Sequence, residues 1–300
     1  MQKGDVVAEQ LAVKKRVANS DKLDRHRSQR PATAALRSQA VERAVAAMRE
    51  QLDQPLPLKA MAGVAALSMH HFARVFRNVT GMPPARFLTA LRLAEAKRLL
   101  LTTSLTVTDV CYQVGYNSAG SFTTRFTQSV GLSPGRFRRL HRSRLAPELA
   151  RRQAVGDGVS APRSCTGQVS GRVHAPGVLP GSVFVGLFRA QIPEGQPAGC
   201  AILPALGRYR ISGVPDGVYY LFAACFPECQ NGLAPLLPDD DSLRVGAGPG
   251  EIRIRRGSAA EDADVWLRPL RPTDPPILVV LPAAPPIRGS PNAARGRCAS

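Results

Sequence analysis

Four neighbouring positions, His70, Ala73, Arg74 and Arg77, combine residue types and spacing suited to contact with nucleic acid. Spacings of three and four residues place them on one face of a helix. A guanidinium can donate two hydrogen bonds to O6 and N7 of guanine, which discriminates against the wrong base by about 1–3 kcal/mol. We therefore predict that Arg74 contacts guanine, that His70 contacts a neighbouring base or phosphate, and that Arg77 binds phosphate.

A second group of residues with short side chains follows about fifty positions later. The face that corresponds to His70, Ala73, Arg74 and Arg77 carries only small residues here, none with a long hydrogen-bond donor. They are Ala119, Gly120, Thr123, Thr124 and Thr127. Such a surface is suited to thymine methyl groups and to DNA shape rather than to guanine. The start of the same helix is suited to phosphate, because free N–H groups and the helix dipole favour anions there. The residues predicted to contact phosphate at this end are Asn117, Ser118 and Ser121, with Arg125 on the flank.

Short amphipathic helices must position the first group. Apolar residues at helical spacing predict a helix from Val41 to Leu52, a short helix that begins near Leu58, and another from Ser68 to Gly81. Ser68 is the expected N-cap, where its hydroxyl can accept a hydrogen bond from a backbone N–H, and Gly81 is expected to end the helix. Two short helices joined by a tight turn in this way form a helix-turn-helix unit.

The same pattern then repeats. From Pro84 a longer helix is predicted to run to about Leu101, which for about 18 residues gives a length of roughly 27 Å. A second helix-turn-helix unit follows, with its N-cap at Asn117 or Ser118, 50 residues after Ser68. One such unit alone fits a solvated helical hairpin as well as it fits a DNA-binding unit. Two units on a helix of this length could contact adjacent major-groove segments, which lie about 34 Å apart in B-DNA.

Residues 56–140 resemble the DNA-binding domain of AraC/XylS-type transcription regulators. The motifs that carry the resemblance are Phe72-x-x-Val-Phe76, Thr80-Gly-Met-Pro-Pro84, Leu91-Arg-Leu-Ala-Glu-Ala-Lys-Arg-Leu-Leu100, Gly115-Tyr116, Ser121-Phe-x-x-x-Phe126 and Gly131-Leu-Ser-Pro-x-x-Phe-Arg138. The resemblance implies an all-α domain that recognises specific DNA sequences through both units. It assigns the main base contacts to His70, Ala73 and Arg74 in the first unit, and the second set to Ala119, Gly120, Thr123 and Thr124.

The resemblance also implies partners. We expect double-stranded operator or promoter DNA as the main partner and RNA polymerase as a second. The family usually places its ligand-binding or dimerisation domain before the DNA-binding part. This chain has the opposite order, because only a short segment precedes the helical pattern and a second domain follows it.

The charge distribution supports a polyanionic partner for the N-terminal half. The 300-residue chain has a net charge of +18, of which +16 falls in residues 1–152 and +2 in residues 153–300. Clustered cations gain affinity for phosphates by releasing condensed counterions. Residues 135–152 are rich in arginine, and we expect Arg136 and Arg139 to contact phosphate. A membrane surface is a weaker alternative, because the arginines do not lie on one long amphipathic helix.

Beyond residue 164 the apolar pattern changes to a period of two, with turn sequences such as Val214-Pro-Asp-Gly217. This predicts an antiparallel β-sandwich, and residues 207–223 with 169–173 resemble the prealbumin-like, carboxypeptidase-regulatory type. Either Tyr219 or Tyr220 faces outward, so an exposed aromatic face could bind a small-molecule effector or a protein partner. The alternative that we favour is a sandwich that buries both faces, one of them under loops.

Other chemistry receives little support from the sequence. The histidines belong to no Ser-His-Asp or Cys-His motif, so we predict no enzyme activity and no cofactor. The six cysteines are expected to be free thiols, because they lack the usual zinc spacing; they are residues 111, 165, 200, 225, 229 and 298. A zinc or redox site is the alternative for the four between residues 165 and 229. The acidic run 239–241 is expected to be a solvated loop rather than a calcium site. The sequence shows no signal peptide and no membrane span, so a cytoplasmic location is expected.

Together these observations predict an α-then-β, multidomain chain with disordered termini. The predicted parts are a basic flexible arm (1–38), a double helix-turn-helix domain (39–144), a linker (145–164), a β-sandwich effector or interaction domain (165–269) and a Pro-rich tail (270–300). The predicted function is sequence-specific transcription regulation modulated by the sandwich. Two alternatives stay open: a sequence-indifferent architectural DNA-binding protein, and an interaction or carbohydrate-binding module that the helical half tethers to DNA.

Overall fold

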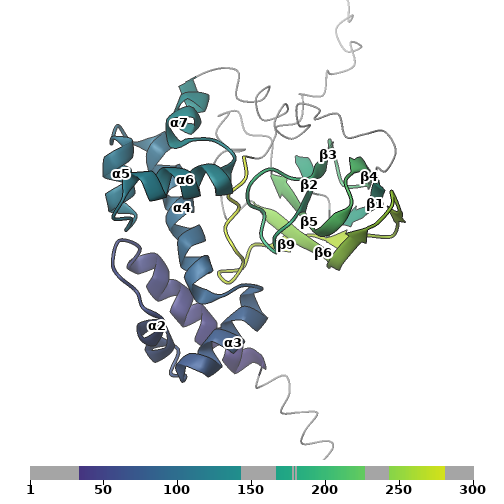
Figure 1. Ribbon diagram of the computed structural model, residues 1–300. Coiled ribbons are helices and arrows are strands. Elements are labelled where there is room, and N and C mark those ends of the chain that lie inside the picture. Colours follow the sequence, from purple (N-terminus) through teal and green to yellow (C-terminus); the bar gives the residue numbers. More distant parts are fainter. Residues whose placement is uncertain (1–33, 143–166, 178, 180, 227–242, 281–300) are drawn as a thin grey trace, which may run out of the picture. The chain divides into compact units, whose positions relative to one another are not determined.

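The computed structural model describes residues 34–142, 167–177, 179, 181–226 and 243–280. The described chain is helical up to residue 142 and rich in β-strands from residue 167 onward (Figure 1). It divides into two compact units. Of the described residues, the first unit contains 34–51 and 56–85, and the second contains 52–55 and those from Arg86 onward.

The first unit contains one helix-turn-helix. A helix at 34–50 buries Val41, Val45 and Met48 along one face, as the apolar spacing predicted. The two short helices are α2 (Leu58–Val64) and α3 (Met69–Thr80). Gly81 ends α3 in the left-handed conformation with φ +80°, which confirms its predicted role.

The predicted capping by the Ser68 hydroxyl is wrong. Ser68 occupies the N-cap position of α3 in an extended conformation, but its side chain accepts no hydrogen bond from the first turn. At the other end of the helix, the Thr80 hydroxyl donates to the carbonyl of Phe76 at 2.8 Å, and the backbone N–H of Met82 donates to the same hydroxyl at 3.3 Å. The stronger local side-chain bonds of this helix therefore lie at its C-terminal end.

The second unit contains the other helix-turn-helix. Helix α4 (Pro84–Thr102) begins at the junction of the units, and α5 (Val107–Gln113), α6 (Ala119–Val130) and α7 (Pro134–Arg142) follow. Thr106 caps α5 in a reciprocal capping box with Asp109. These hydrogen bonds from Thr106 lower the pKa of the Asp109 carboxyl. The apolar cluster of this region includes Phe122, Phe126 and Phe137 from α6 and α7.

The helical half is an internal repeat with an offset of 50 residues. Helices α3 and α6 start at residues 69 and 119 and end at 80 and 130, and α4 and α7 start at prolines 84 and 134. Gly81 and Gly131 end their helices with φ of +80° and +89°. The buried phenylalanines 72, 76 and 87 recur at 122, 126 and 137. The buried phenylalanines, the glycine that ends the second helix and the proline that starts the next one therefore recur at one spacing, whereas α2 and α5 start 49 residues apart.

The β region (residues 167–269) forms two sheets. The first contains β4 (Arg208–Val214), β1 (Gly167–His174) and β7 (Ala259–Ala260), with β8 (Val265–Trp266) also paired to β1. The second has the order β3 (Gly199–Leu203), β2 (Ser182–Phe188), β5 (Gly217–Phe226), β6 (Arg244–Ile254) and β9 (Arg268–Pro269). Residues from both sheets, such as Val169, Val185, Ile211 and Tyr219, share one buried cluster.

The pairing differs from the predicted all-antiparallel arrangement. The pairs β1–β4, β2–β3, β2–β5, β5–β6 and β6–β9 are antiparallel, whereas β7 and β8 run parallel to β1. The reason is the path of the chain: after β6 it leaves the five-stranded sheet and crosses to the other sheet, which it enters in the same direction as β1.

The outer side of the five-stranded sheet is also covered. Strand β2 is buried along its whole length, with Val183, Val185 and Leu187 in the cluster between the sheets. Phe184 and Phe188 belong instead to a separate cluster that includes Val279. Tyr219 is the inward-facing tyrosine, buried in the cluster between the sheets, and Tyr220 is half-buried. Part of this outer side is thus covered by the segment around Val279, whereas Phe222 stays half-buried like Tyr220.

The prediction of disordered termini is wrong at two places. The first helix begins at residue 34, inside the segment predicted as a flexible arm, because Ala34, Ala35 and Leu36 extend the helical run. Residues 270–280, predicted to belong to a disordered tail, pack against the rest of the second unit, with Leu278 and Val280 buried. Residues 1–33, the linker around 143–166, and 281–300 lie outside the described residues, as do Cys165, Cys229, Cys298 and the acidic run 239–241.

Candidate nucleic-acid interface

The first candidate surface is the polar face of α3. Phe72, Val75 and Phe76 are buried on the opposite side, where the Phe72 and Phe76 rings meet edge to face with centroids 5.4 Å apart. His70, Arg74 and Arg77 are exposed and Ala73 is half-buried between them; no ion pair of Arg74 or Arg77 is found among the described residues. The structure therefore brings the four predicted positions of the first unit onto one accessible helix face.

The second candidate surface is the corresponding face of α6. Phe122 and Phe126 anchor the helix, with ring centroids 5.6 Å apart, and Tyr116 packs edge to face on Phe122 at 5.3 Å. Gly120 and Thr124 are exposed, whereas Ala119 and Thr123 are half-buried. This face has no long side chain at the predicted base-contact positions, so backbone and methyl groups can approach a DNA surface closely.

The start of α6 supplies the predicted phosphate-contacting groups. Asn117, Ser118 and Ser121 are exposed, and so is Arg125 one turn further on. Ser118, one of the two predicted caps, occupies the N-cap position, and its hydroxyl accepts a hydrogen bond from the backbone N–H of Ser121 at 3.4 Å. The hydroxyl proton of Ser118 remains available to donate to an anion at this helix end.

Helix α7 separates two kinds of arginine. Arg136 and Arg139 are exposed, as a phosphate contact requires. Arg138 is half-buried instead and donates from Nε to the carbonyl of Leu100 at 3.2 Å. Its Nη2 donates to the carbonyl of Leu105, so this arginine closes the turn after α4. Residues of one type in one arginine-rich run thus have different roles, which only the three-dimensional contacts reveal.

Arg92 is another basic residue with a structural role that the sequence did not reveal. Its Nε donates to the carbonyl of Leu52 and its Nη2 to the carbonyl of Gln54, both at 2.8 Å. Partial burial lowers the pKa of this guanidinium. The turn at Gly115 packs against the same place, because a Cβ on Gly115 would lie 2.5 Å from the Leu52 carbonyl oxygen. Position 115 of the Gly115-Tyr116 motif therefore requires glycine for two reasons, this close approach and its φ of +82°.

Other chemistry among the described residues is limited. No group of three His, Cys, Asp or Glu side chains within the described ranges could hold a metal ion. Cys111 and Cys225 are buried thiols whose pKa values burial raises. On the β region, Trp266 stacks on His174 with ring centroids 4.4 Å apart, and His174 contacts Asp264 at 3.1 Å. None of the helices described here combines the length and apolar character needed to cross a bilayer.

Comparison with known proteins agrees with this geometry for the helical part. Residues 61–140 match a family model described as a helix-turn-helix domain. Those residues comprise most of α2 and all of α3 to α6, which are the elements that carry both candidate surfaces. Residues 61–140 are therefore a helix-turn-helix domain. Both predicted sets of contact residues, and the exposed arginines of α7, lie inside this helix-turn-helix domain.

Relatives of the helix-turn-helix domain include named regulators. One is the RCS-specific HTH-type transcriptional activator RclR of Escherichia coli, 34% identical over 105 residues, which are 34% of this chain and 37% of that protein. Another is the HTH-type transcriptional activator AarP of Providencia stuartii, 34% identical over 87 residues, covering 29% of this chain and 64% of the relative. The matches thus span little more than a third of RclR and less than two thirds of AarP.

A solved structure also matches the helix-turn-helix domain. It is the DNA-binding domain of AdpA, a global transcriptional factor, in complex with a target DNA. The sequence identity is 31%, the match covers 35% of this chain and 94% of that one, and the TM-score is 0.34.

Proposed function

We propose that this protein is a sequence-specific transcription regulator that contacts DNA through both helix-turn-helix units. The observation that carries the proposal is the 50-residue repeat, which presents two polar helix faces, on α3 and α6, from two units that share their buried phenylalanines and their helix-ending glycine. A solvated helical hairpin would not need the same capping glycine, proline and phenylalanine positions twice. The named activators among the relatives support the regulatory part of the proposal.

The two faces are proposed to contact different features of DNA. The first unit supplies His70, Ala73 and Arg74 for bases and Arg77 for phosphate, with Arg74 on guanine O6 and N7. The second unit contacts thymine methyl groups and DNA shape through Ala119, Gly120, Thr123 and Thr124. The proposed phosphate contacts of the second unit are Asn117, Ser118, Ser121, Arg125, Arg136 and Arg139. Helix α4 has 19 residues and a length of about 28 Å, close to the pitch of B-DNA of about 34 Å.

The β region is proposed to modulate this activity. Its two sheets share one buried cluster, as expected for the proposed prealbumin-like β-sandwich. The β region and the second helix-turn-helix belong to one compact unit, so a change in one can reach the other. A small-molecule effector or a protein partner on the β region would then regulate DNA binding or contact with RNA polymerase. This activity would be exerted on chromosomal DNA in the bacterial cytoplasm.

The alternative is a sequence-indifferent architectural DNA-binding protein, which the charge of +16 on residues 1–152 would also suit. Salt dependence cannot separate the two functions, because both release counterions. Selection of bound duplexes from a randomised pool by the full chain at near-physiological salt does separate them. Enrichment of a pair of short motifs about one helical turn apart supports specific regulation. Binding without enrichment supports the architectural protein.

A further inference from the structure

A cavity of about 80 Å³ lies on the outer side of the five-stranded sheet. Its floor consists of strands β2, β5 and β6, which contribute Phe184, Phe222 and Val245. Its opposite wall includes Pro193 and Ile277. The lining is mainly apolar and the cavity opens to solvent, which is the character of a small-molecule site rather than of a packing defect.

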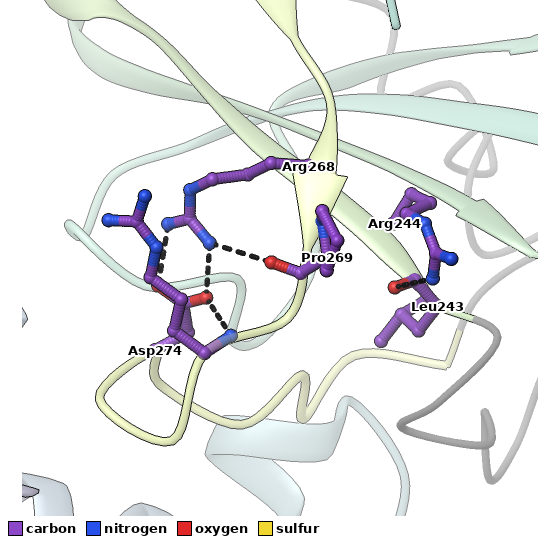
Figure 2. A network of polar contacts seen from close by, with 6 residues as sticks. Leu243, Arg244, Arg268, Pro269 and Asp274 are labelled. Carbon is purple, nitrogen blue, oxygen red and sulfur yellow. Dashed lines mark hydrogen bonds and ion pairs between the residues drawn. The ribbon is translucent and has the colours of Figure 1, made fainter. Parts of the chain in front are cut away.

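The charged residues of the cavity neutralise one another. Arg268 donates from Nη1 and Nη2 to the two carboxylate oxygens of Asp274 at 2.6 and 2.7 Å, and from Nη1 to the carbonyl of Pro269 at 3.0 Å (Figure 2). The backbone N–H of Arg271 donates to the same carboxylate at 2.7 Å. A charged ligand would have to break this bidentate pair or enter an apolar space without a counterion. An uncharged ligand needs neither.

The walls differ in rigidity. The floor strands are fixed by antiparallel ladders, β2 with β5 and β5 with β6. The covering segment (residues 275–280) belongs to no strand. Its N–H groups of Leu278 and Val279 donate to the single carbonyl of Pro193 at 3.2 and 3.3 Å, and its Ile277 carbonyl accepts from Lys97 Nζ at 3.1 Å. An apolar cavity that admits benzene measures about 150 Å³. A ligand of that size either extends through the opening to solvent or moves a wall. The covering segment has fewer hydrogen bonds than the floor strands, so it is the wall that we expect to move.

The covering segment contacts the second helix-turn-helix directly, so its movement would change the packing of that unit. Ile277 and Val279 pack on the sheet cluster, whereas Leu278 and Val280 are buried in the helical cluster with Phe126 and Phe137. The other wall residue, Pro193, precedes Glu194, whose carboxylate accepts from the Ser129 hydroxyl on α6 at 3.3 Å. The covering segment and the segment at Pro193 and Glu194 thus both line the outer wall of the cavity and both contact the helices.

We propose that this cavity binds a small, uncharged, mainly apolar molecule, and that binding lifts the covering segment away from the second helix-turn-helix unit. The proposal rests on the proposed function in one respect: lifting the segment regulates transcription only if that unit binds DNA. The site and the movement themselves do not depend on it.

The test uses the full chain and the uncharged fluorescent probe N-phenyl-1-naphthylamine. Three variants accompany the wild type. Ala247→Phe adds a ring at an exposed position that lines the cavity, Arg253→Phe adds the same ring to the same strand outside it, and Ile277→Ala enlarges it. We expect saturable binding that Ala247→Phe weakens at least tenfold, that Arg253→Phe leaves unchanged, and that Ile277→Ala strengthens. Equal binding by all variants, equal loss in both Phe variants, or no saturable binding overturns the site.

Amide hydrogen exchange tests the movement. With the probe bound, we expect the N–H groups of Leu278 and Val279 to exchange at least several-fold faster than in the free protein. Binding that leaves their exchange unchanged or slower overturns the movement. Neither measurement contains DNA. Failure of the proposed function would therefore be seen separately: the protein would still bind the probe but would enrich no sequence from a randomised duplex pool.

Discussion

The Nζ atom of Lys97 lies 3.1 Å from the carbonyl oxygen of Ile277, 180 residues further along the chain. Lys97 is only 2% exposed, and its ammonium group also lies 5.8 Å from the centre of the Phe137 ring. This hydrogen bond ties helix α4 of the helix-turn-helix domain to the covering segment. A buried ammonium with one carbonyl partner is costly, so it gives the junction a measurable dependence on pH.

Burial lowers the pKa of Lys97 from its ordinary value of 10.5 to about 7. Between these values the unfolded chain binds a proton that the folded protein lacks, so the free energy of unfolding should rise with pH by up to about 1.4 kcal/mol per unit. Below pH 7 both states are protonated and this contribution stays constant. Denaturant titrations at pH 6, 7.5 and 9 should show a smaller rise in the lower interval and a larger rise in the upper one.

Two substitutions isolate this contribution. Lys97→Met keeps the apolar part of the side chain. It should lower the slope of the unfolding free energy against pH, between pH 7.5 and 9, by the contribution of about one proton. Lys59→Met, at an exposed lysine, is the matched control and should leave the slope as in the wild type. If Lys97→Met and the wild type had parallel stability profiles over this interval, the buried environment of Lys97 would be wrongly described.

Leu278 and Val279 are adjacent but face different clusters. Leu278 is fully buried among the helices, so Leu278→Ala should cost about 2–5 kcal/mol and speed hydrogen exchange in α4 and α6. Val279 packs with Phe184 and Phe226, so Val279→Ala should speed exchange in β2 and β5 instead. Exchange measured by peptide-resolved mass spectrometry distinguishes the two patterns. The same pattern in both variants would contradict the alternation.

Two glycines with positive φ should tolerate alanine differently. Gly131 has φ +89° with open space around a Cβ, so Gly131→Ala should cost only the left-handed penalty of about 1–2 kcal/mol. Gly115→Ala should cost more, because its Cβ would also lie 2.5 Å from the Leu52 carbonyl oxygen. Gly135→Ala, in helix α7, is the control and should be neutral or stabilising by up to about 1 kcal/mol. Thermal unfolding of the three variants checks this order.

Local sequence signals predicted most of the helical half. The spacing of Phe72, Val75 and Phe76 fixed which face of α3 is buried, and therefore which face presents Arg74. Gly81 marked the end of α3 because left-handed geometry favours glycine. Exposed positions such as Thr124 followed from the same periodicity at α6. These features depend on neighbours within one or two helical turns, which the sequence displays directly.

The remaining features depend on contacts between residues far apart in the chain. Arg92 and Arg138 lie in motifs of the family resemblance and Arg139 does not, but the motifs gave neither arginine a role. In the structure Arg92 and Arg138 donate to backbone carbonyls, whereas Arg139 is exposed. The covering segment has the proline content of a tail, and only the apolar surfaces on both of its sides make it ordered. The buried Lys97 lies in a motif that the family resemblance identified, but its partner is 180 residues away.

Arg74 and Arg139 should have different effects on DNA binding. Arg74→Ala removes a proposed guanine contact and should cost about 1–3 kcal/mol on an enriched duplex while relaxing specificity at one position. Arg139→Ala removes a proposed phosphate contact and should weaken binding to all duplexes alike. Binding isotherms on the enriched duplex and on a scrambled one check both. Uniform loss in both variants would show that α3 does not contact bases.

The central claim is that two differently built surfaces contact adjacent major-groove segments, and chemical interference on an enriched duplex tests it most directly. Methylation of guanine N7 should block binding within one segment, and this block should disappear in Arg74→Ala. Replacement of thymine by uracil should weaken binding in a second segment about one helical turn away, because the C5-methyl contacts of Thr123 and Thr124 would be lost. Interference confined to one segment, or to none, would contradict the account.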